Sequence, residues 1–452
     1  MESQLLVVGG GLAGCEAAWQ AAQQGVRVTL AEMRPVRMTP AHHTDRLAEL
    51  VCSNSLRGAA LENAVGLLKE ELARLDSVIV RSARDAAVPA GGALAVDRER
   101  FAALVTERVG AHPSIEIRRE EVTAIDASRP TIIACGPLAS EALAAEIDRL
   151  VGGRLHYYDA ASPIVAADSI AMERLYAASR YGKGGDDYLN IPLDEEQYLR
   201  LVEDLRTLPR HEPKEFERDA AGGRAPFFEG CLPVEVMADR GVETLRYGPL
   251  KPVGLRDPRT GKTPHAVVQL RKENAAGTAY NLVGFQTRLS WPAQREAFGR
   301  LPGLEQAEWL RLGVMHRNTF IQSPRLLDRH LSLRDHPGIR FAGQITGVEG
   351  YVEAAGSGAI AGLEAARAIR GELPLDLAPT TMLGCIIAYL QDATSEDFQP
   401  SNITWANVAP LEPELETREK RERRRRLAAR ALAEVERLRE TLGRGAGYEA
   451  AV

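Results

Sequence analysis

The sequence predicts an α/β protein with a parallel sheet that is interrupted by a separate α+β unit. Three observations predict this fold class. The chain opens with an apolar strand, a glycine-rich turn, an alanine-rich helix and a second strand. Short apolar runs, prolines and aromatic residues then dominate residues 157–330, and another strand–glycine–helix element follows near residues 340–370. Alternating strands and helices are typical of a parallel sheet covered by helices, and the change of texture indicates an insertion.

The first element is a strand over residues 4–9, QLLVVG, whose continuous apolar character predicts burial on both faces. An alanine-rich helix is expected over residues 12–25, and a second strand over residues 26–32 ends in Glu32. A strand, turn, helix and strand of this length form a Rossmann-like unit that binds a dinucleotide. Glu32 stands where an acidic side chain accepts hydrogen bonds from ribose hydroxyls.

The turn between the first strand and the helix, which we call the glycine turn, has the pattern Gly9-x-Gly11-x-x-Gly14. Gly9 permits the tight turn, Gly11 lets the backbone approach a pyrophosphate, and Gly14 lets helix and strand pack closely. The helix N-terminus stabilises the phosphate charge. Ordinary glycine-rich loops share the bare pattern, and its position between strand and helix favours the binding function. We expect the cofactor to contact Gly9, Gly10, Gly11, Leu12, Ala13, Gly14 and Glu32.

The dinucleotide is expected to be FAD. An acidic residue at position 32 suits an unphosphorylated ribose, which disfavours NADP. Residues 341–358, FAGQITG running into AAGSG, form a distal element of the kind that closes over the flavin in a two-part, glutathione-reductase-like fold. Residues 131–136 are expected to return to the sheet beside the adenosine. From the distal element we expect contacts by Gly343, Gln344, Gly347, Gly356 and Ser357.

These elements divide the chain into four parts. Residues 1–156 are expected to form the first part of the FAD-binding domain, residues 157–330 an inserted α+β domain, residues 331–410 the return of the FAD-binding domain, and residues 411–452 a C-terminal basic helix. The helix itself is expected over residues 416–441. Its arginine block either contacts nucleic acid or forms a solvated face beside nearby glutamates. The block consists of Arg421, Arg423, Arg424, Arg425 and Arg426.

The composition is that of a globular protein outside the membrane. Of the 452 residues, 45% are hydrophobic and 26% are charged. No stretch approaches the roughly 20 apolar residues that span a bilayer. The start MESQLLVVGGG lacks the features of a signal peptide, so we expect a cytoplasmic location. The formal net charge of −6 does not predict a nucleic-acid partner, which would need a local basic face.

Five cysteines are scattered through the chain without a CxxC pair. This pattern argues against a zinc site and a disulfide framework, and no histidine pair has metal-ligand spacing, so we expect no metal. Cys52 in ELVCSNSLR and Cys231 in FFEGCLPVE are each either a buried small hydrophobe or a reactive thiol. The acidic neighbours of Cys231 would by themselves raise its pKa. Cys15 and Cys385 lie in apolar surroundings and are expected to pack.

Several sequence blocks together resemble one family of enzymes. They include GGGLAGCEAAWQAA, EMRPVRMTPAHHTDRLAELVCSNSLR, FFEGCLPVEVMADRG and FAGQITGVEGYVEAAGSG. They resemble the TrmFO family of folate- and FAD-dependent tRNA (uracil-5-)-methyltransferases, over residues 4 to about 407. The related MnmG (GidA) family, which modifies the wobble uridine, is the alternative because it shares the first block. Its members are longer and carry an extra helical C-terminal domain, which counts against it. A structural or redox-sensing flavoprotein without enzymatic activity ranks below both.

The resemblance implies methylation of C5 of uridine 54 in the tRNA T-loop, with 5,10-methylenetetrahydrofolate as carbon donor and FAD reduced by NAD(P)H. A thiolate that adds at C6 makes C5 nucleophilic, and a base must then remove the C5 proton. The resemblance implies Cys231 as the nucleophile and Cys52 as the base or second thiol, and leaves the assignment within the pair open. Cys135 replaces a residue that is more often threonine in the family, so we expect no catalytic role for it. Folate is expected to contact His43, Arg288 and Tyr351, and the tRNA to contact the arginine block.

Overall fold

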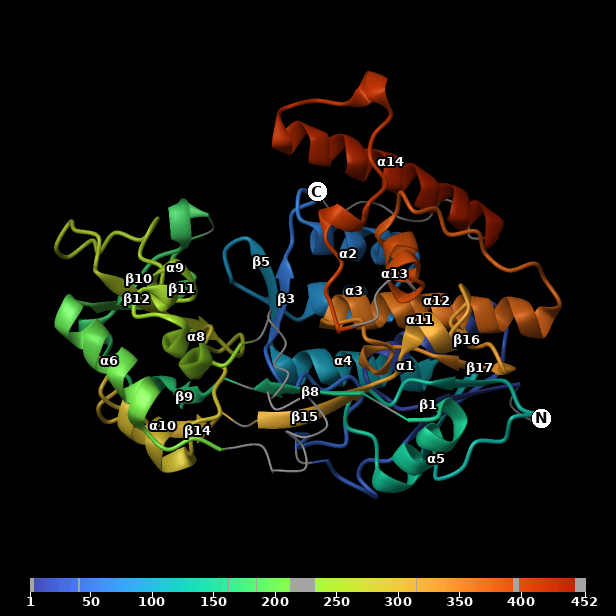
Figure 1. Ribbon diagram of the computed structural model, residues 1–452, viewed down its shortest axis with the longest axis horizontal. Helices are drawn as coiled ribbons and strands as arrows, with labels where there is room; N and C mark the ends of the chain where they lie inside the picture. The colour runs from blue at the N-terminus through green and yellow to red at the C-terminus, as the bar shows by residue number, and fades with distance from the viewer. Residues whose placement is uncertain are drawn as a thin grey trace.

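The computed structural model describes residues 4–39, 41–153, 155–160, 162–183, 185–211, 232–313, 315–392 and 398–443 of the chain. Figure 1 shows a larger part with a sheet covered by helices and a smaller part drawn in green and yellow. We call the described residues from 162 to 313 the second body, and the described residues up to 153 and from 321 onward the main body. A pair of strands between these ranges connects the two.

The central sheet of the main body contains the N-terminal unit. β1 (Leu5–Val8) pairs in parallel with β2 (Val28–Glu32) on one side and with β7 (Thr131–Ile133) on the other. Their apolar residues fit a sheet that is buried on both faces. The parallel sheet with its helices confirms the α/β part of the predicted fold class, although β1 and β2 are shorter than expected. The order across the sheet is β16 (Ser332–Leu333), β17 (His336–Phe341), β7, β1, β2 and β6 (Ile115–Arg119), with β16 antiparallel to β17.

Two helices that are far apart in the sequence lie side by side over this sheet. α1 (Leu12–Gln23) follows the glycine turn, and α12 (Tyr351–Arg370) completes the distal element (Figure 1). A Cβ atom on Gly358 would lie 2.2 Å from the carbonyl oxygen of Ala13, and Gly362 makes a similar backbone contact one turn later. Glycine is therefore required where the two helices touch. This contact places the glycine turn beside the distal element.

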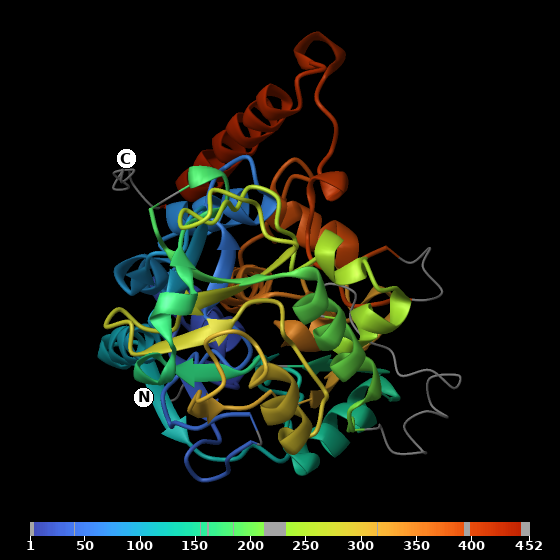
Figure 2. The same ribbon diagram turned by 90° about the vertical axis from the view of Figure 1, so that its left-hand side faces the viewer.

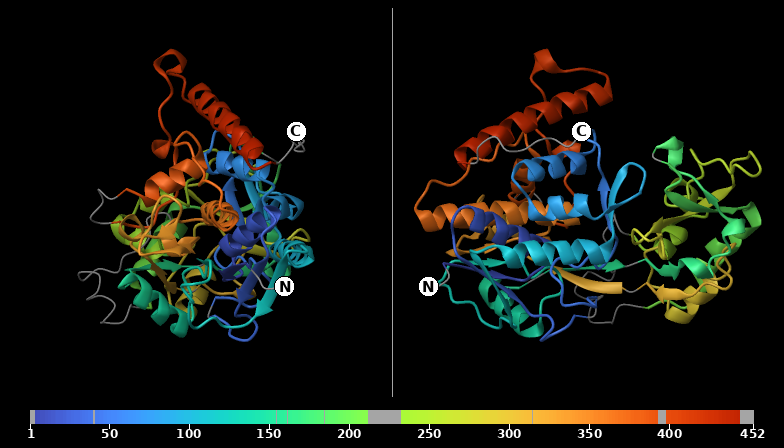
Figure 3. Two further views of the ribbon diagram at one scale, coloured as in Figure 1. Left: turned by 90° about the vertical axis from the view of Figure 1, so that its right-hand side faces the viewer. Right: turned by 180° about the vertical axis from the view of Figure 1, so that it is seen from behind.

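The other helices of the main body cover the sheet on both sides. Figure 3 shows most of them stacked on one side, with α5 on the other. No helix in the described part of the chain is long and apolar enough to cross a membrane. The helices are α2 (Ala64–Arg74), α3 (Val78–Asp85), α4 (Arg98–Ala111), α5 (Glu141–Val151), α11 (Ser323–Leu326), α13 (Met382–Leu390) and α14 (Lys420–Thr441). A three-stranded sheet with the order β3 (Ser55–Gly58), β5 (Ala93–Val96) and β4 (Ala87–Val88) lies at their edge.

The second body has its own antiparallel sheet and its own hydrophobic core. Tyr198, Phe285 and Phe298 are among the buried residues of this core. β8 (Leu155–Ala160) and β15 (Met315–Phe320) pair antiparallel and connect the second body to the main body. The sheet has the order β10 (Tyr176–Ala177), β11 (Tyr188–Leu193), β12 (Ala266–Lys272), β13 (Ala279–Leu282), β9 (Ile164–Ala166) and β14 (Trp309–Arg311). Its helices are α6 (Glu195–Thr207), α8 (Val234–Arg240), α9 (Thr244–Tyr247) and α10 (Trp291–Phe298).

The C-terminal helix α14 lies on the outside of the main body, as Figure 2 shows in red. It begins at Lys420 rather than at residue 416, because the side chain of Glu419 caps its first turn by accepting backbone N–H groups at 2.7 and 3.1 Å. An ion pair of 2.7 Å between Arg74 and Glu436 attaches it to α2. The side chains that it buries are Leu427, Ala428, Ala431, Leu432, Val435 and Arg439.

A buried carboxylate ties α2 to α13. Glu71 accepts the backbone N–H groups of Met382 and Leu383 at 2.8 and 3.0 Å. Burial raises the pKa of Glu71 from 4.5 to about 7, and the two N–H groups offset part of this effect. Between these pH values the native protein keeps a proton that the unfolded chain has lost. Stability must therefore fall as the pH rises through this window.

We expect the substitution Glu71→Gln to remove this pH dependence. Relative to the variant, the wild-type protein should lose about 3 kcal/mol of unfolding free energy between about pH 4.5 and pH 7. This is the free energy that corresponds to the change in the pKa of Glu71, at about 1.4 kcal/mol per pKa unit. Chemical denaturation of both proteins at about pH 5 and about pH 8 measures the difference. A difference that is the same at both pH values would contradict the raised pKa.

Candidate active site

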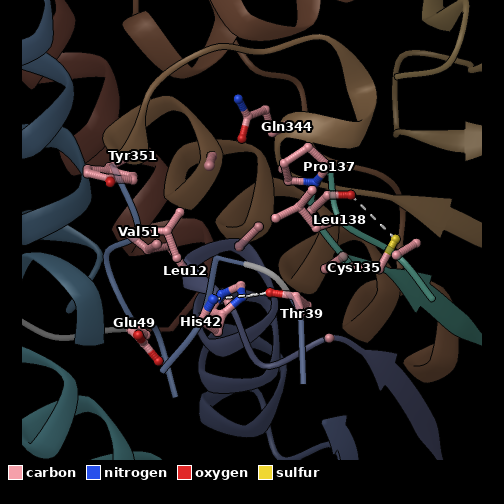
Figure 4. Close-up of a pocket in the computed structure, with 18 of the residues that line it drawn as sticks. Leu12, Thr39, His42, Glu49, Val51, Cys135, Pro137, Leu138, Gln344 and Tyr351 are labelled. Atoms are coloured by element: carbon pink, nitrogen blue, oxygen red, sulfur yellow. Dashed lines mark hydrogen bonds between the residues drawn. The ribbon is translucent and has the colours of Figure 1, made fainter. Parts of the chain in front are cut away.

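A cavity of about 430 Å³ lies at the carboxyl ends of the parallel strands. Residues that follow β1, β2, β7 and β17 line it, together with the loop before β3. In Figure 4, Tyr351 and Val51 lie on one side of the cavity, Cys135 and Pro137 on the other, and Leu12 between them. Open α/β sheets bind ligands at this end, where the strand order reverses. β1 is such a point, because β2 and β7 lie on opposite sides of it.

The glycines of the glycine turn differ in what their missing side chains allow. Gly9 has a φ of +105°, and a Cβ atom there would lie 2.6 Å from the carbonyl oxygen of Ala134. A Cβ atom on Gly14 would lie 1.8 Å from the carbonyl oxygen of Gly9. The fold itself therefore requires these two glycines. Gly11 lines the cavity, and no described heavy atom lies within 4 Å of its Cβ position, so the space beside it is open to a ligand.

Glu32 places a buried carboxylate in the cavity wall. It accepts the Gly10 N–H at 2.7 Å and the Arg34 Nε–H at 2.8 Å. Burial alone would raise its pKa, but the hydrogen bonds and the charge of Arg34 outweigh burial and hold the pKa below its usual range. Glu32 is therefore ionised at neutral pH. Arg34 also donates from Nη1 to Glu49 at 3.1 Å, a link to the loop before β3 that the sequence pattern did not reveal.

The distal element contributes one wall of the cavity. Gly343 and Gln344 line it, and the Gly343 N–H donates to Ser357 Oγ at 2.8 Å. Gly347 and Gly356 serve packing, because a Cβ atom on them would lie 2.6 Å from the Phe398 ring and 2.8 Å from Ile386 Cδ1, respectively. The predicted cofactor residues thus divide into residues that line the cavity and residues that allow the surrounding chain to pack.

Cys52 and Tyr351, which the sequence predicted for different roles, meet at the cavity. The backbone N–H groups of Cys52 and Ser53 donate to the Tyr351 hydroxyl oxygen at 2.9 and 3.1 Å. Burial, and then the nearby Cys52 thiol, raise the pKa of Tyr351, so its hydroxyl stays protonated. Both side chains line the cavity. The second predicted thiol, Cys231, lies outside the described residues.

The other described cysteines differ from Cys52. Burial raises the pKa of Cys15 well above its usual range and that of Cys385 to about 12. Such thiols stay protonated at neutral pH, which is typical of buried cysteines that serve only to pack the core. Cys135 lines the cavity with its Sγ 3.6 Å from the Gly136 carbonyl oxygen. In the described part of the chain, no group of three or more His, Cys, Asp or Glu side chains could hold a metal ion.

Two of the three predicted folate residues lie away from the described cavity walls. His43 is exposed, and its backbone N–H donates to Glu49 Oε1 at 2.9 Å. Its neighbour His42 lines the cavity instead, with Nδ1 2.6 Å from Thr39 Oγ1 (Figure 4). Arg288 lies in the second body with Nε 3.6 Å from Glu235, whereas Gln286, two residues earlier, lines the cavity. The direction of side chains in these irregular segments has no periodic signal in the sequence.

α14 lies on the outside of the main body (Figure 1), and no residue of the arginine block is among those that line the cavity. Arg421, Arg423, Arg425 and Arg426 are exposed, and Arg424 is half-buried. Arg421 and Arg425 pair with Glu62 at 3.0 and 3.3 Å, and Arg426 pairs with Glu422 at 3.0 Å. The guanidinium of Arg424 lies 5.9 Å from the centre of the Trp405 ring, and that of Arg423 lies 3.6 Å from Glu416. Surface pairs of this kind are weak, so these arginines can exchange partners with a polyanion.

Comparisons with known proteins found relatives in sequence and a similar fold. The sequence model of the family described as Glucose inhibited division protein A matches residues 4–373. The chain is 57% identical over 437 residues to Methylenetetrahydrofolate--tRNA-(uracil-5-)-methyltransferase TrmFO of Geobacter sulfurreducens, covering 96% of this chain and 99% of that protein. It is also 57% identical over 432 residues to the protein of the same name from Heliobacterium modesticaldum, covering 95% and 97%. The fold resembles that of Aquifex aeolicus GidA with a TM-score of 0.72 at 17% identity, covering 98% of this chain and 74% of that one.

Proposed function

We propose, because the chain belongs to the TrmFO family, that it is a methylenetetrahydrofolate--tRNA-(uracil-5-)-methyltransferase, which adds a methyl group to C5 of a uracil in tRNA. The observation that carries this proposal is the 57% identity over nearly the full length of two relatives of that name. We further propose uridine 54 of the T-loop as the target. The resemblance noted in the sequence blocks supports this choice.

The residues of the cavity fit FAD. Gly11 leaves open space at the N-terminus of α1, where a pyrophosphate would be stabilised by backbone N–H groups. Glu32 is ionised and accepts three hydrogen bonds, one from Gly10 at Oε2 and two from Arg34 at Oε1, so Oε2 retains a lone pair for a ribose hydroxyl. We propose that the glycine turn and the distal element hold FAD here. When bound and reduced by NAD(P)H, the flavin supplies the electrons that turn a folate methylene into a methyl group.

The nucleophilic and acid–base steps on the uracil belong to side chains of this chain. In this proposal the Cys231 thiolate adds at C6 of the uracil and shifts an electron pair to C5, which attacks the methylene carbon of the folate as one of its two C–N bonds breaks. Cys52 accepts the C5 proton as the second C–N bond breaks, so that tetrahydrofolate leaves and a methylene group remains on C5. The two electrons and the proton that complete the methyl group would come from the bound, reduced flavin, and the bond from Cys231 to C6 breaks as the ring double bond returns. Tyr351 holds the backbone at Cys52 and so orients that thiol.

We propose that residues 157–330 form a domain inserted into a glutathione-reductase-like FAD domain.

The binding sites of the two remaining partners, folate and tRNA, are proposed from the positions of the residues. Folate is placed at the Tyr351 side of the cavity, with His42 as an additional candidate because its ring lines the wall. The exposed arginine block of α14 is proposed to contact the tRNA backbone, where positive charge contributes most to affinity.

The decisive experiment supplies the purified protein with tRNA that lacks the modification, NADPH, and methylenetetrahydrofolate labelled at the methylene carbon. We expect label at C5 of uridine 54, located by nuclease mapping. Label at the wobble uridine would instead support a GidA-like reaction. Methylation that requires S-adenosylmethionine, or labelled folate that never transfers carbon to tRNA, would refute the proposal.

A further inference from the structure

Three consecutive carbonyl groups in residues 50–54, which we call the Cys52 loop, accept hydrogen bonds from arginines. Arg98, at the start of α4, donates from Nη1 to the carbonyl oxygen of Leu50 at 2.5 Å and from Nη2 to that of Cys52 at 3.2 Å. Arg311, the last residue of β14, donates from Nη2 to the carbonyl oxygen of Val51 at 2.7 Å. The backbone on both sides of the thiol is therefore fixed by guanidinium groups.

A third arginine holds the next two residues through their side chains. Arg271, on β12, donates from Nε to Asn54 Oδ1 at 2.7 Å and from Nη2 to Ser53 Oγ at 2.8 Å. Asn54 returns a hydrogen bond from Nδ2 to the Lys272 carbonyl oxygen at 2.8 Å. Each residue of the Cys52 loop thus has an arginine partner, and two of the three arginines come from the second body.

The same groups place positive charge beside the thiol. Arg271 is buried, Arg98 and Arg311 are half-buried, and all three interact electrostatically with Cys52. Glu273, buried and paired with Arg98, supplies one negative charge against these three positive ones. Among the described residues, the titratable and charged groups around the loop include Arg98 from α4, Arg271 from β12, Glu273 directly after β12, Arg311 from β14 and Tyr351 from α12. Glu49, which pairs with Arg34, directly precedes the loop, and the ion pair of Arg57 and Glu353 lies beside it.

We propose that Arg98, Arg271 and Arg311 are positioning residues, which fix the Cys52 loop at the cavity and favour the anionic form of the Cys52 thiol. Positive charge next to a thiol stabilises its thiolate, which is the form that accepts a proton or attacks an electrophile. Arg98 and Arg311 are not among the described residues that line the cavity, so they act through Cys52. The inference rests on the proposed function for the use that is made of this thiolate.

The origin of the arginines adds a structural condition. Because Arg271 and Arg311 belong to the second body, the Cys52 loop reaches its full set of partners when the second body is docked on the main body. The reactivity of the thiol is then set by the contact between the two bodies as well as by the loop itself.

The test measures how fast iodoacetamide alkylates Cys52 as a function of pH. The alkylated peptide is quantified by mass spectrometry, so the other cysteines do not interfere. In Arg311→Gln one positive charge is lost, and we expect the midpoint of the pH profile to rise by about one pKa unit, which makes alkylation about tenfold slower near neutral pH. The rate at high pH should not fall, because a thiolate of higher pKa is intrinsically no less nucleophilic. Arg311→Lys keeps the charge and should shift the midpoint less.

Two further variants show in which direction charge moves the midpoint of the alkylation profile and provide a control in which the midpoint should not move. Glu273→Gln removes the negative charge but can still accept from Arg98, so its midpoint should move to lower pH. Arg200→Gln, which breaks an exposed pair with Glu196 at 2.9 Å elsewhere in the second body, should leave the profile unchanged. If Arg311→Gln fails to fold, Glu273→Gln still decides the sign.

An unchanged midpoint in Arg311→Gln and Glu273→Gln, or an Arg311→Gln rate lowered equally at every pH, would overturn the inference. The assay contains neither tRNA nor folate. A protein that shows the expected shifts but makes no methylated uridine would therefore refute the proposed function and leave this inference standing.

Discussion

Replacing Cys52 with serine is expected to reduce methyl transfer to tRNA by about a thousandfold, the usual size of a general-base contribution. A serine hydroxyl is not ionised at neutral pH, so it cannot accept the C5 proton as a thiolate does. The loop should keep its position, because Arg98 and Tyr351 hold its backbone rather than its thiol. Single-turnover labelling of unmodified tRNA measures the loss.

The two thiols of the proposed pair should fail at different steps. Cys231→Ser is expected to abolish the covalent adduct between protein and tRNA, whereas Cys52→Ser should form the adduct and then stall, which a denaturing gel of protein and labelled tRNA resolves. The reverse pattern would exchange the two roles. Cys385→Ala serves as the control and should keep its rate, because this buried thiol lies away from the described cavity walls. A Cys52→Ser protein with the wild-type rate would remove Cys52 from the mechanism.

Two alanine substitutions in the glycine turn are expected to fail for different physical reasons. Gly14→Ala would place Cβ 1.8 Å from the Gly9 carbonyl oxygen, so the backbone must shift, and we expect a loss of at least about 3 kcal/mol of unfolding free energy. Gly11→Ala meets no described atom and keeps a φ of −75°, so the flavin-free protein should be as stable as wild type. Its Cβ would enter the cavity, and we expect FAD affinity to fall at least about tenfold, or 1.4 kcal/mol.

Denaturation of the flavin-free proteins and fluorescence titration with FAD separate these effects. Gly110→Ala is the matched control, because the new Cβ would meet Ile117 Cδ1 at 3.6 Å, which is an ordinary contact inside the helix α4. It should match or exceed wild-type stability and leave FAD binding unchanged. Gly11→Ala with unchanged FAD affinity would place the pyrophosphate elsewhere in the cavity.

The glycine turn and Glu32 could be predicted from sequence because their physics is local. A turn that needs a positive φ, and a backbone that must pass close to a strand, each demand glycine at one position, and Gly9 and Gly14 meet these demands. The distal element was recognisable for the same reason. Its Gly347 and Gly356 pack against Phe398 and Ile386. The sequence pattern could not distinguish them from glycines that line the cavity, because it does not show which residues lie beside each glycine.

The arginines at the Cys52 loop could not be predicted in this way. Arg271 lies 217 residues from its partner Asn54, and nothing in its own segment distinguishes it from a solvated arginine. The prediction of the folate-binding residues missed the cavity by only one or two positions. His43 and Arg288 each lie one or two residues from a side chain that lines the cavity, because irregular chain has no period that reveals its facing direction.

The position of β17 in the central sheet has a consequence for synthesis on the ribosome. β7 pairs with β1 early in the chain, but its other edge must wait for β17, which follows about 200 residues later and takes roughly 10 to 40 s to emerge at common elongation rates. An unpaired edge of buried, apolar β7 is prone to join a neighbouring nascent chain. The second body is made during this interval and has its own core. Nascent chains that stall between residues 133 and 336 should therefore aggregate or recruit chaperones more than chains that stall after residue 370.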